Sequence, residues 1–137
     1  MRLSLEKASM ICDKALEKAR AMKIRPLCIA VLDDGGNLKA LKRDDGASVL
    51  RPSIAIGKAW GAIGMGESSR SLENRLKERP AFLGALSVMS GGKVVPVPGG
   101  VLILADNDHR RGGRQRCHRG RRRGLRRCRN PGRRPPA

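Results

Sequence analysis

The side chains best suited to binding a metal ion lie near the C-terminus. Cys117 and His118 are adjacent, and Cys128 follows with ten residues between the two cysteines. Structural zinc sites use four ligands, with paired cysteines only a few residues apart. Because the spacing here fits no standard site and no fourth ligand lies nearby, the sequence argues against zinc and leaves any other metal unknown.

The rest of the chain offers no recognisable catalytic set. Residues 1–108 contain no histidine, since the two histidines of the chain are His109 and His118. No Ser-His-Asp triad, phosphate-binding loop or pair of catalytic carboxylates can be assembled from residues 1–108. The sequence therefore does not predict an enzyme.

Arginine dominates the chain after residue 108. Residues 109–137 hold 13 arginines and no Lys, Asp or Glu, so they carry +13 of the net charge of +18, which leaves +5 for residues 1–108. Such a segment buries too little apolar surface to fold, and we expect a disordered tail. It would bind nucleic acid through phosphate neutralisation, without base selectivity because it lacks aromatic residues. Non-specific nucleic-acid association is therefore one function that the sequence allows.

Nothing in the sequence predicts a membrane protein. No stretch approaches the roughly 20 apolar residues of a membrane span, and Met1-Arg2-Leu3 runs straight into a helix start rather than a signal peptide. Cys12 and Cys28 fall at apolar positions of a predicted helix and a predicted strand, so we expect core thiols rather than disulfides. These features predict a cytoplasmic protein.

The elements that must position any site begin with a helix and a hairpin. Residues 1–108 have the length of one domain. Ser4 is a candidate N-cap, and apolar residues recur from there to Met22 at helical spacing, which predicts an amphipathic helix. The apolar run 27–32 and the segment 38–43 predict two strands, with glycine-containing turns between them and after them.

The second half of this domain is predicted to be mostly helical. Pro52 opens a second helix that is rich in Gly and Ala, and residues 71–77 favour a short third helix. Pro80 is placed to begin a fourth helix that runs to about Met89. Two further strand-like runs follow, 93–97 and 101–105, on either side of Pro98-Gly99-Gly100.

Several segments, taken in order, resemble the GlcG/HbpS-like family, which also supplies the C-terminal domain of some cobalamin adenosyltransferases. They are AVLDDGGNLKAL at 30–41, RDDGA at 43–47, RPSIAIGKAWGA at 51–62, RPAF at 79–82 and VPVPGGVLI at 95–103. The resemblance implies an α+β fold with a profilin-like antiparallel sheet and packed helices. It also implies a homo-oligomer and a small ligand, haem or another tetrapyrrole, without an assigned activity.

The family-like segments also supply candidate site residues. Their polar members would contact a small-molecule ligand: Asp33, Arg43, Asp45, Lys58 and Arg79. The alternative is structural, with the aspartates fixing turns and Lys58 and Arg79 forming salt bridges between subunits. The motif residues that we expect to shape the backbone are Gly35, Gly36, Gly46, Pro80, Pro98, Gly99 and Gly100.

Haem is the cofactor that the resemblance raises, and its iron needs an axial ligand. Family members can supply a histidine from the first helix, but the first helix of this chain has none. Met10, Cys12 and Met22 are the alternatives there, and Cys12 and Met22 fit the apolar core stripe of that helix. Support for haem from this helix is therefore weak.

The family pattern stops where the arginines begin. In the family, the turn at 106–108 leads to a strand resembling Gly-Ala-Val-Gly and then to an Ala-rich last helix. Arginine codons of the CGN type, read one nucleotide later, give Val, Ala, Asp, Glu or Gly, and the shifted codons from residue 109 permit Ile-Val-Gly-Ala-Val-Gly. Our hypothesis is that residues 1–108 form a truncated domain and that 109–137 are a frameshift product replacing the last strand and helix.

Overall fold

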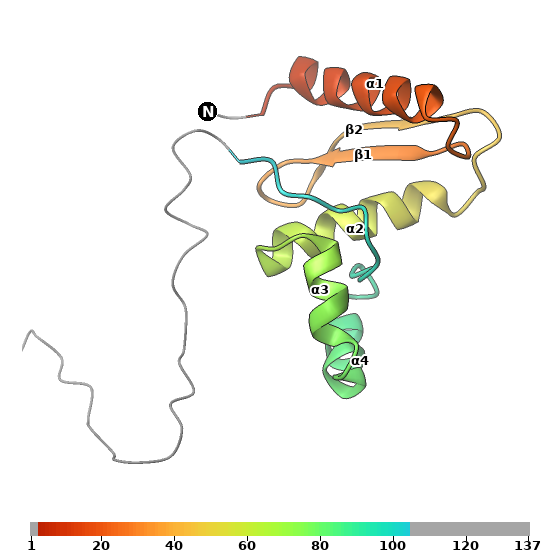
Figure 1. The fold of residues 1–137 in the computed structure, drawn as a ribbon. Helices are drawn as coiled ribbons and strands as arrows, with labels where there is room; N and C mark the ends of the chain where they lie inside the picture. The colour runs from red at the N-terminus through yellow and green to blue at the C-terminus, as the bar shows by residue number, and fades with distance from the viewer. Residues whose placement is uncertain (1–2, 105–137) are drawn as a thin grey trace, which may run out of the picture.

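The computed structural model describes residues 3–104, which form two strands and four helices. Along the chain these are α1 (Leu5–Ala21), β1 (Cys28–Leu32), β2 (Leu38–Arg43), α2 (Arg51–Met65), α3 (Ser69–Leu76) and α4 (Pro80–Met89). Figure 1 shows the hairpin between α1 and α2, with α3 and α4 on the side of α2 away from the sheet. The predicted α+β class is confirmed.

Helix α1 forms where its sequence predicts, but Met22 follows the helix and is 59% exposed, so its predicted place in the core stripe is wrong. The Ser4 hydroxyl accepts a hydrogen bond from the Lys7 backbone N–H at 3.2 Å, so the N-cap satisfies one of the free donors of the first turn. Ala8 and Cys12 are fully buried on the apolar stripe and pack against Val31 of β1. This cluster is the core between α1 and the sheet, and it confirms Cys12 as a core thiol.

Strands β1 and β2 form an antiparallel hairpin. Their register runs from Cys28 opposite Arg43 to Leu32 opposite Leu38, with an irregularity between Val31 and Leu32. Within residues 3–104 the sheet has no third strand. The hairpin brings apolar side chains to both faces, which α1 and α2 then cover.

Helix α2 covers the other face of the hairpin and also approaches the chain near residue 94. Gly57 and Gly61 are buried. A Cβ atom at Gly57 would lie 2.5 Å from Val95 Cγ2, too close for any side chain. The glycines that would weaken an isolated helix therefore allow a close approach of another segment.

A second hydrophobic cluster lies below α2. Leu72 and Leu76 of α3, Leu86 of α4 and Val94 are buried together. The predicted Pro80 start of α4 is confirmed, whereas α3 begins at Ser69, two residues earlier than expected. The Ser68 hydroxyl explains the earlier start, because it accepts a hydrogen bond from the Ser71 backbone N–H and caps the helix.

The predicted strands at 93–97 and 101–105 are wrong as far as the structure describes them, because no strand is present from residue 93 to 104. A strand needs a partner for its backbone groups. Instead, Gly100 exchanges two hydrogen bonds with Ser69 at the start of α3, and Val95 packs on Gly57 of α2. The segment is thus held against helices rather than paired in the sheet. The expected last strand and helix lie outside the described residues.

Candidate functional site

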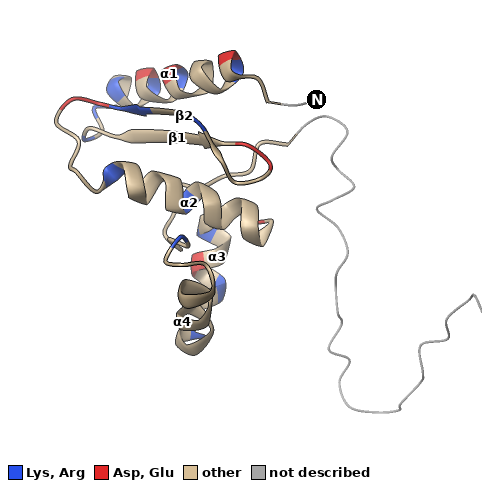
Figure 2. Ribbon diagram, turned by 180° about the vertical axis from the view of Figure 1, so that it is seen from behind, with Lys and Arg blue, Asp and Glu red and all other residues tan. Residues whose placement is uncertain are grey.

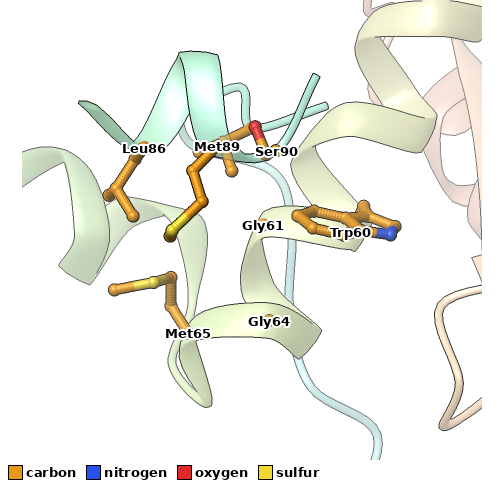
Figure 3. Close-up of a pocket in the computed structure, with 8 residues that line it drawn as sticks. Trp60, Gly61, Gly64, Met65, Leu86, Met89 and Ser90 are labelled. Carbon is orange, nitrogen blue, oxygen red and sulfur yellow. The ribbon is translucent and has the colours of Figure 1, made fainter. Parts of the chain in front are cut away.

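An apolar pocket of about 130 Å³ lies between the C-terminal half of α2, the end of α4 and the chain at residue 94. Hydrophobic side chains and two glycines form most of its wall, and the hydroxyl of Ser90 is the one side-chain polar group in the lining (Figure 3). The lining residues are Trp60, Gly61, Gly64, Met65, Leu86, Met89, Ser90 and Val94. Such a wall favours an apolar or soft ligand over a charged one.

Trp60 joins the pocket to the hairpin. A Cβ atom at Gly36 would lie 2.9 Å from Trp60 Nε1, so the indole reaches the β1–β2 turn. Gly36 also has a φ of 79°, a conformation that favours glycine. On the ring itself, Lys93 Nζ stands 5.6 Å from the centroid, within the range of a cation–π contact. One aromatic side chain therefore contacts the turn, the pocket and a cation.

Two methionines supply the sulfur atoms of the pocket. Figure 3 shows Met65 of α2 and Met89 of α4 entering the space from different helices, with their sulfur ends turned toward one another. Met89 is 80% exposed, so its thioether is accessible from solvent. The thioether is a soft, neutral donor, and it binds haem iron or copper(I) more strongly than it binds hard cations.

The two thiols of the described chain are unsuited to ligand binding. Cys12 and Cys28 are both buried and form no disulfide. Burial raises the pKa of each thiol above its ordinary value. A raised pKa keeps the proton on sulfur, whereas metal ions bind the thiolate. No group of three His, Cys, Asp or Glu residues suited to a metal ion occurs within residues 3–104.

The candidate residues from the hairpin lie at its two ends. Asp33 is in the β1–β2 turn, where its Oδ1 accepts hydrogen bonds from the backbone N–H groups of Gly35 and Asn37 at 3.0 and 2.9 Å. Arg43 ends β2 at the opposite end of the hairpin, and the exposed Asp45 follows it. Asp33 therefore fixes its turn through these hydrogen bonds.

The turn role of Asp33 predicts a pH dependence of stability. The hydrogen bond from the Asn37 backbone N–H, followed by the other donors, lowers the pKa of Asp33 below its ordinary value of 3.8. Because the pKa of Asp33 is lower in the folded state, its carboxylate stabilises the fold fully above the ordinary value. This stabilisation is lost as the pH falls through the lowered pKa of the folded state. We expect Asp33→Asn to reduce the loss of Tm between pH 6 and pH 3.

Thermal unfolding of both proteins at the two pH values measures this difference. Asp34→Asn is the matched control, because the neighbouring Asp34 carboxylate makes none of these turn contacts. An identical fall in Tm for wild type and Asp33→Asn would contradict the role assigned to Asp33.

The other two candidates lie on the helices. Lys58 is on α2, and its aliphatic stem lies beneath the loop at Gly99, where a Cβ atom would stand 3.4 Å from Lys58 Cδ. Arg79 is the exposed N-cap residue of α4. None of the five candidates lines the apolar pocket, and their role in ligand binding stays a prediction.

The motif residues expected to shape the backbone lie at four places. Gly35 and Gly36 lie in the hairpin turn, and Gly46 has a φ of 78° in the turn after β2. Pro80 is at the start of α4. The fourth place is a loop, in which the Gly100 N–H donates to Ser69 Oγ at 2.7 Å and the Gly100 carbonyl accepts from the Ser69 N–H at 2.9 Å. The loop residues are Pro98, Gly99 and Gly100.

Sequence reasoning did not find the pocket residues Trp60, Met65 and Met89. Each occupies an apolar position of a predicted helix, which on its own indicates core packing. One available signal was the uniqueness of the tryptophan in a chain with a single other aromatic residue. The other signal was the absence of charged residues from the segment that forms α4, whose ribbon in Figure 2 is almost entirely tan.

The predictions made for the arginine-rich segment fall outside the described residues. These concern the disordered tail, its nucleic-acid association, the frameshift hypothesis, and the argument against a zinc site at Cys117, His118 and Cys128. Among residues 3–104, no helix has the length and apolar character needed to cross a bilayer.

Comparison with protein families identifies one match. A family model described as haem degrading protein HbpS-like matches residues 3–113. A comparison with curated proteins found no match.

Solved structures share the fold over most of the chain. A double mutant of HbpS from Streptomyces reticuli is 26% identical, with a TM-score of 0.64 over 78% of this chain and 68% of that one. The PduOC–haem complex is 25% identical, with a TM-score of 0.67 over 77% and 75% of the two chains. Klebsiella pneumoniae protein ORFY is 22% identical, with a TM-score of 0.66 over 77% and 72%, and shows the fold alone.

Proposed function

Since the chain belongs to the HbpS-like family, we propose that it binds haem or a related tetrapyrrole, with one edge of the macrocycle in the apolar pocket. The observation that carries the proposal is the pocket itself, an apolar wall with two thioethers and one indole. The solved PduOC–haem complex, 25% identical to this chain, supports the choice of ligand class.

The donor set of the pocket fits haem, and its size limits how haem would bind. Methionine is among the axial ligands that haem iron accepts, and Lys93 beside Trp60 offers a cation for a propionate group. A pocket of about 130 Å³ is smaller than the roughly 300–1,000 Å³ typical of sites that enclose an organic ligand. The pocket therefore takes an edge of the macrocycle, and the remainder lies outside it.

The proposal is restricted to binding. Haem degradation, which the family description names, needs a reductant and oxygen in addition to bound haem. The expected homo-oligomer also stays a prediction. It is supported by α4, whose exposed Phe82, Val88 and Met89 form an apolar face of the kind that subunit contacts cover.

Haem titration of the full chain, followed at the Soret band and by Trp60 fluorescence, tests the proposal. We expect a saturable Soret shift and, in parallel, quenching of the emission, because Trp60 is the only tryptophan and lines the pocket. Both signals should give the same dissociation constant and a stoichiometry of one or less per chain.

A variant that fills the pocket provides the control. Gly61→Leu projects a side chain from the pocket wall and should abolish both signals, whereas Gly84→Leu, at an α4 position with no atom within 4 Å of an added Cβ, should leave both unchanged. Absence of a saturable Soret shift in folded wild-type protein would refute the proposed function. A Soret shift without quenching would place haem elsewhere on the chain. Slow bleaching of the bound spectrum in the presence of ascorbate would reveal degradation in addition to binding.

A further inference from the structure

The hairpin has two edges, and their strands differ in charge. Strand β2 reads LKALKR and contains Lys39, Lys42 and Arg43, whereas β1 reads CIAVL and contains no charged residue. Charged side chains on an edge strand, lysine above all, oppose pairing with a further strand. Strand β1 therefore has the composition of an inner strand, although within residues 3–104 it pairs on one side only.

The backbone of β1 offers hydrogen-bonding groups on its open side. By the register of the hairpin and the alternation of an antiparallel pair, Ile29 and Val31 bond to β2. The N–H and carbonyl groups of Cys28 and Ala30 point away from β2, and they bond to no backbone group in the described part of the chain. A peptide in the extended conformation would bond to both residues at once.

Helix α2 lies under the open edge. It contacts β1 more than β2, and it also supports residues 93–104, because Val95 packs on Gly57 and Gly100 approaches Lys58. Figure 1 shows residues 93–104 on the β1 side of the hairpin, away from β2. They form no backbone hydrogen bond with β1. The described structure therefore places no strand on this edge, although a helix is in position to support one.

We infer that the open edge of β1 binds an extended, uncharged and apolar peptide of another molecule as an added strand. The side chains of a strand point alternately to the two faces of a sheet, and α2 covers one of these faces with a helix rich in Ala, Ile and Gly. Apolar side chains at alternate positions of the peptide would lie on that helix. The edge is distinct from the apolar pocket, whose lining includes no residue of β1.

Two other occupants fit the edge less well, because both bring positive charge. The chain's own residues 109–116 read HRRGGRQR and would place arginine side chains against an apolar layer. A second copy paired through its β1 would bring its positively charged β2 over α2, whose charged residues, Arg51 and Lys58, are also positive. A single apolar peptide avoids both penalties.

Titration of the full chain with the acetylated and amidated peptide Ile-Val-Gly-Ala-Val-Gly, followed by backbone NMR and amide hydrogen exchange, tests the inference. This peptide is uncharged and apolar on both faces. We expect saturable binding, with exchange of the Cys28 and Ala30 N–H groups slowed at least about tenfold by their new hydrogen bonds. Arg43 and Leu41 lie opposite these residues on β2. Their N–H groups face the other edge, and their exchange rates should not change.

A proline on each edge provides a matched pair of variants. Ala30→Pro removes an N–H of the open edge but no bond of the hairpin, because this N–H points away from β2. It should weaken peptide binding at least about tenfold, the value of a hydrogen bond at the upper end of its usual range. Leu41→Pro removes the equivalent N–H from the outer edge of β2 and should leave the affinity unchanged.

Modified peptides test the same bonds without a substitution in the protein. One version is N-methylated at its first, third and fifth residues, and the other at its second, fourth and sixth. Because alternate N–H groups of a strand face the same neighbour, one version should lose binding at least about tenfold relative to the other. The peptide His-Arg-Arg-Gly-Gly-Arg, the sequence of residues 109–114, should not bind.

Four results would overturn the inference. They are no saturable binding of the apolar peptide to the folded chain, equal protection of both hairpin edges, equal affinities of the two N-methylated peptides, and an affinity unchanged in folded Ala30→Pro. A fifth result would assign the edge to a second copy instead. In that case Cys28 and Ala30 would be protected without peptide, and their protection would rise with protein concentration.

Discussion

Replacing Gly100 by alanine is expected to lower the free energy of unfolding by about 3 kcal/mol, with a fall in Tm of roughly 15 °C. A Cβ atom at this position would lie 2.2 Å from the carbonyl oxygen of Lys58 and 2.7 Å from its carbonyl carbon. Both are backbone atoms of α2, so no flexible side chain can move aside. The loop must move away from the helix instead.

Movement of the loop would also break the contact between Gly100 and Ser69. Ser69 is fully buried, and its hydroxyl and N–H are bonded to the two backbone groups of Gly100. An unpaired buried group costs about 1–3 kcal/mol. Ser69→Ala, which removes the hydroxyl and leaves the Gly100 N–H unpaired, should therefore destabilise the fold by about 1–2 kcal/mol, less than Gly100→Ala.

Urea unfolding of the two variants measures these effects, and Gly84→Ala is the matched control. Gly84 lies within α4, has no positive φ, and has no atom within 4 Å of an added Cβ. Alanine there should raise stability by up to about 1 kcal/mol, because glycine weakens a helix interior. Equal effects of Gly84→Ala and Gly100→Ala would show that the loop does not contact α2 as described.

Restoring the shifted reading frame after residue 108 is expected to produce a larger change, from a broad unfolding transition at low temperature to a sharp transition at a higher temperature. In the hairpin register, the Asp44 N–H bonds to the Leu27 carbonyl and the Asp33 N–H to the Asn37 carbonyl. The alternation of an antiparallel pair then turns the backbone groups of Cys28 and Ala30 away from β2. They bond to no backbone group in the described part of the chain.

Besides the free backbone groups of β1, the chain after residue 100 exposes apolar side chains. Val101, Ile103 and Leu104 are 71%, 57% and 63% exposed, although their sequence favours a strand. The shifted codons permit the strand-like sequence Ile-Val-Gly-Ala-Val-Gly, and the family pattern continues from there into a further helix. A strand paired with β1 would satisfy the free groups and cover apolar surface. We expect a gain of at least about 3 kcal/mol, from two or more backbone pairs at 1–3 kcal/mol each.

Differential scanning calorimetry of the 137-residue chain and the restored chain measures this gain. A chain ending at residue 108 is the control, and its stability should equal that of the 137-residue protein, because the arginine-rich segment adds no apolar surface. Resequencing the codons for residues 104–116 tests the hypothesis independently through an extra or missing base. A sharp, high-temperature transition in the 137-residue protein itself would contradict the expected instability.

The sequence by itself determined the elements whose signals are local. The apolar spacing after Ser4 specified α1, the two glycines after Asp33 specified the hairpin turn, and Pro80 marked the start of α4. Each depends on backbone preferences or on bonds between residues close in the chain. For the same reason the family resemblance could be recognised from short motifs.

Only the tertiary structure decided how the distant segments meet. Residues 93–104 have the composition of strands, yet strand formation depends on a partner elsewhere in the chain, and Gly100 is bonded to Ser69 instead. The pocket likewise depends on α2 and α4 bringing Trp60, Met65 and Met89 together. Apolar residues on separate helices carry no signal of a shared cavity, because their types are the same in a filled core and in a binding site.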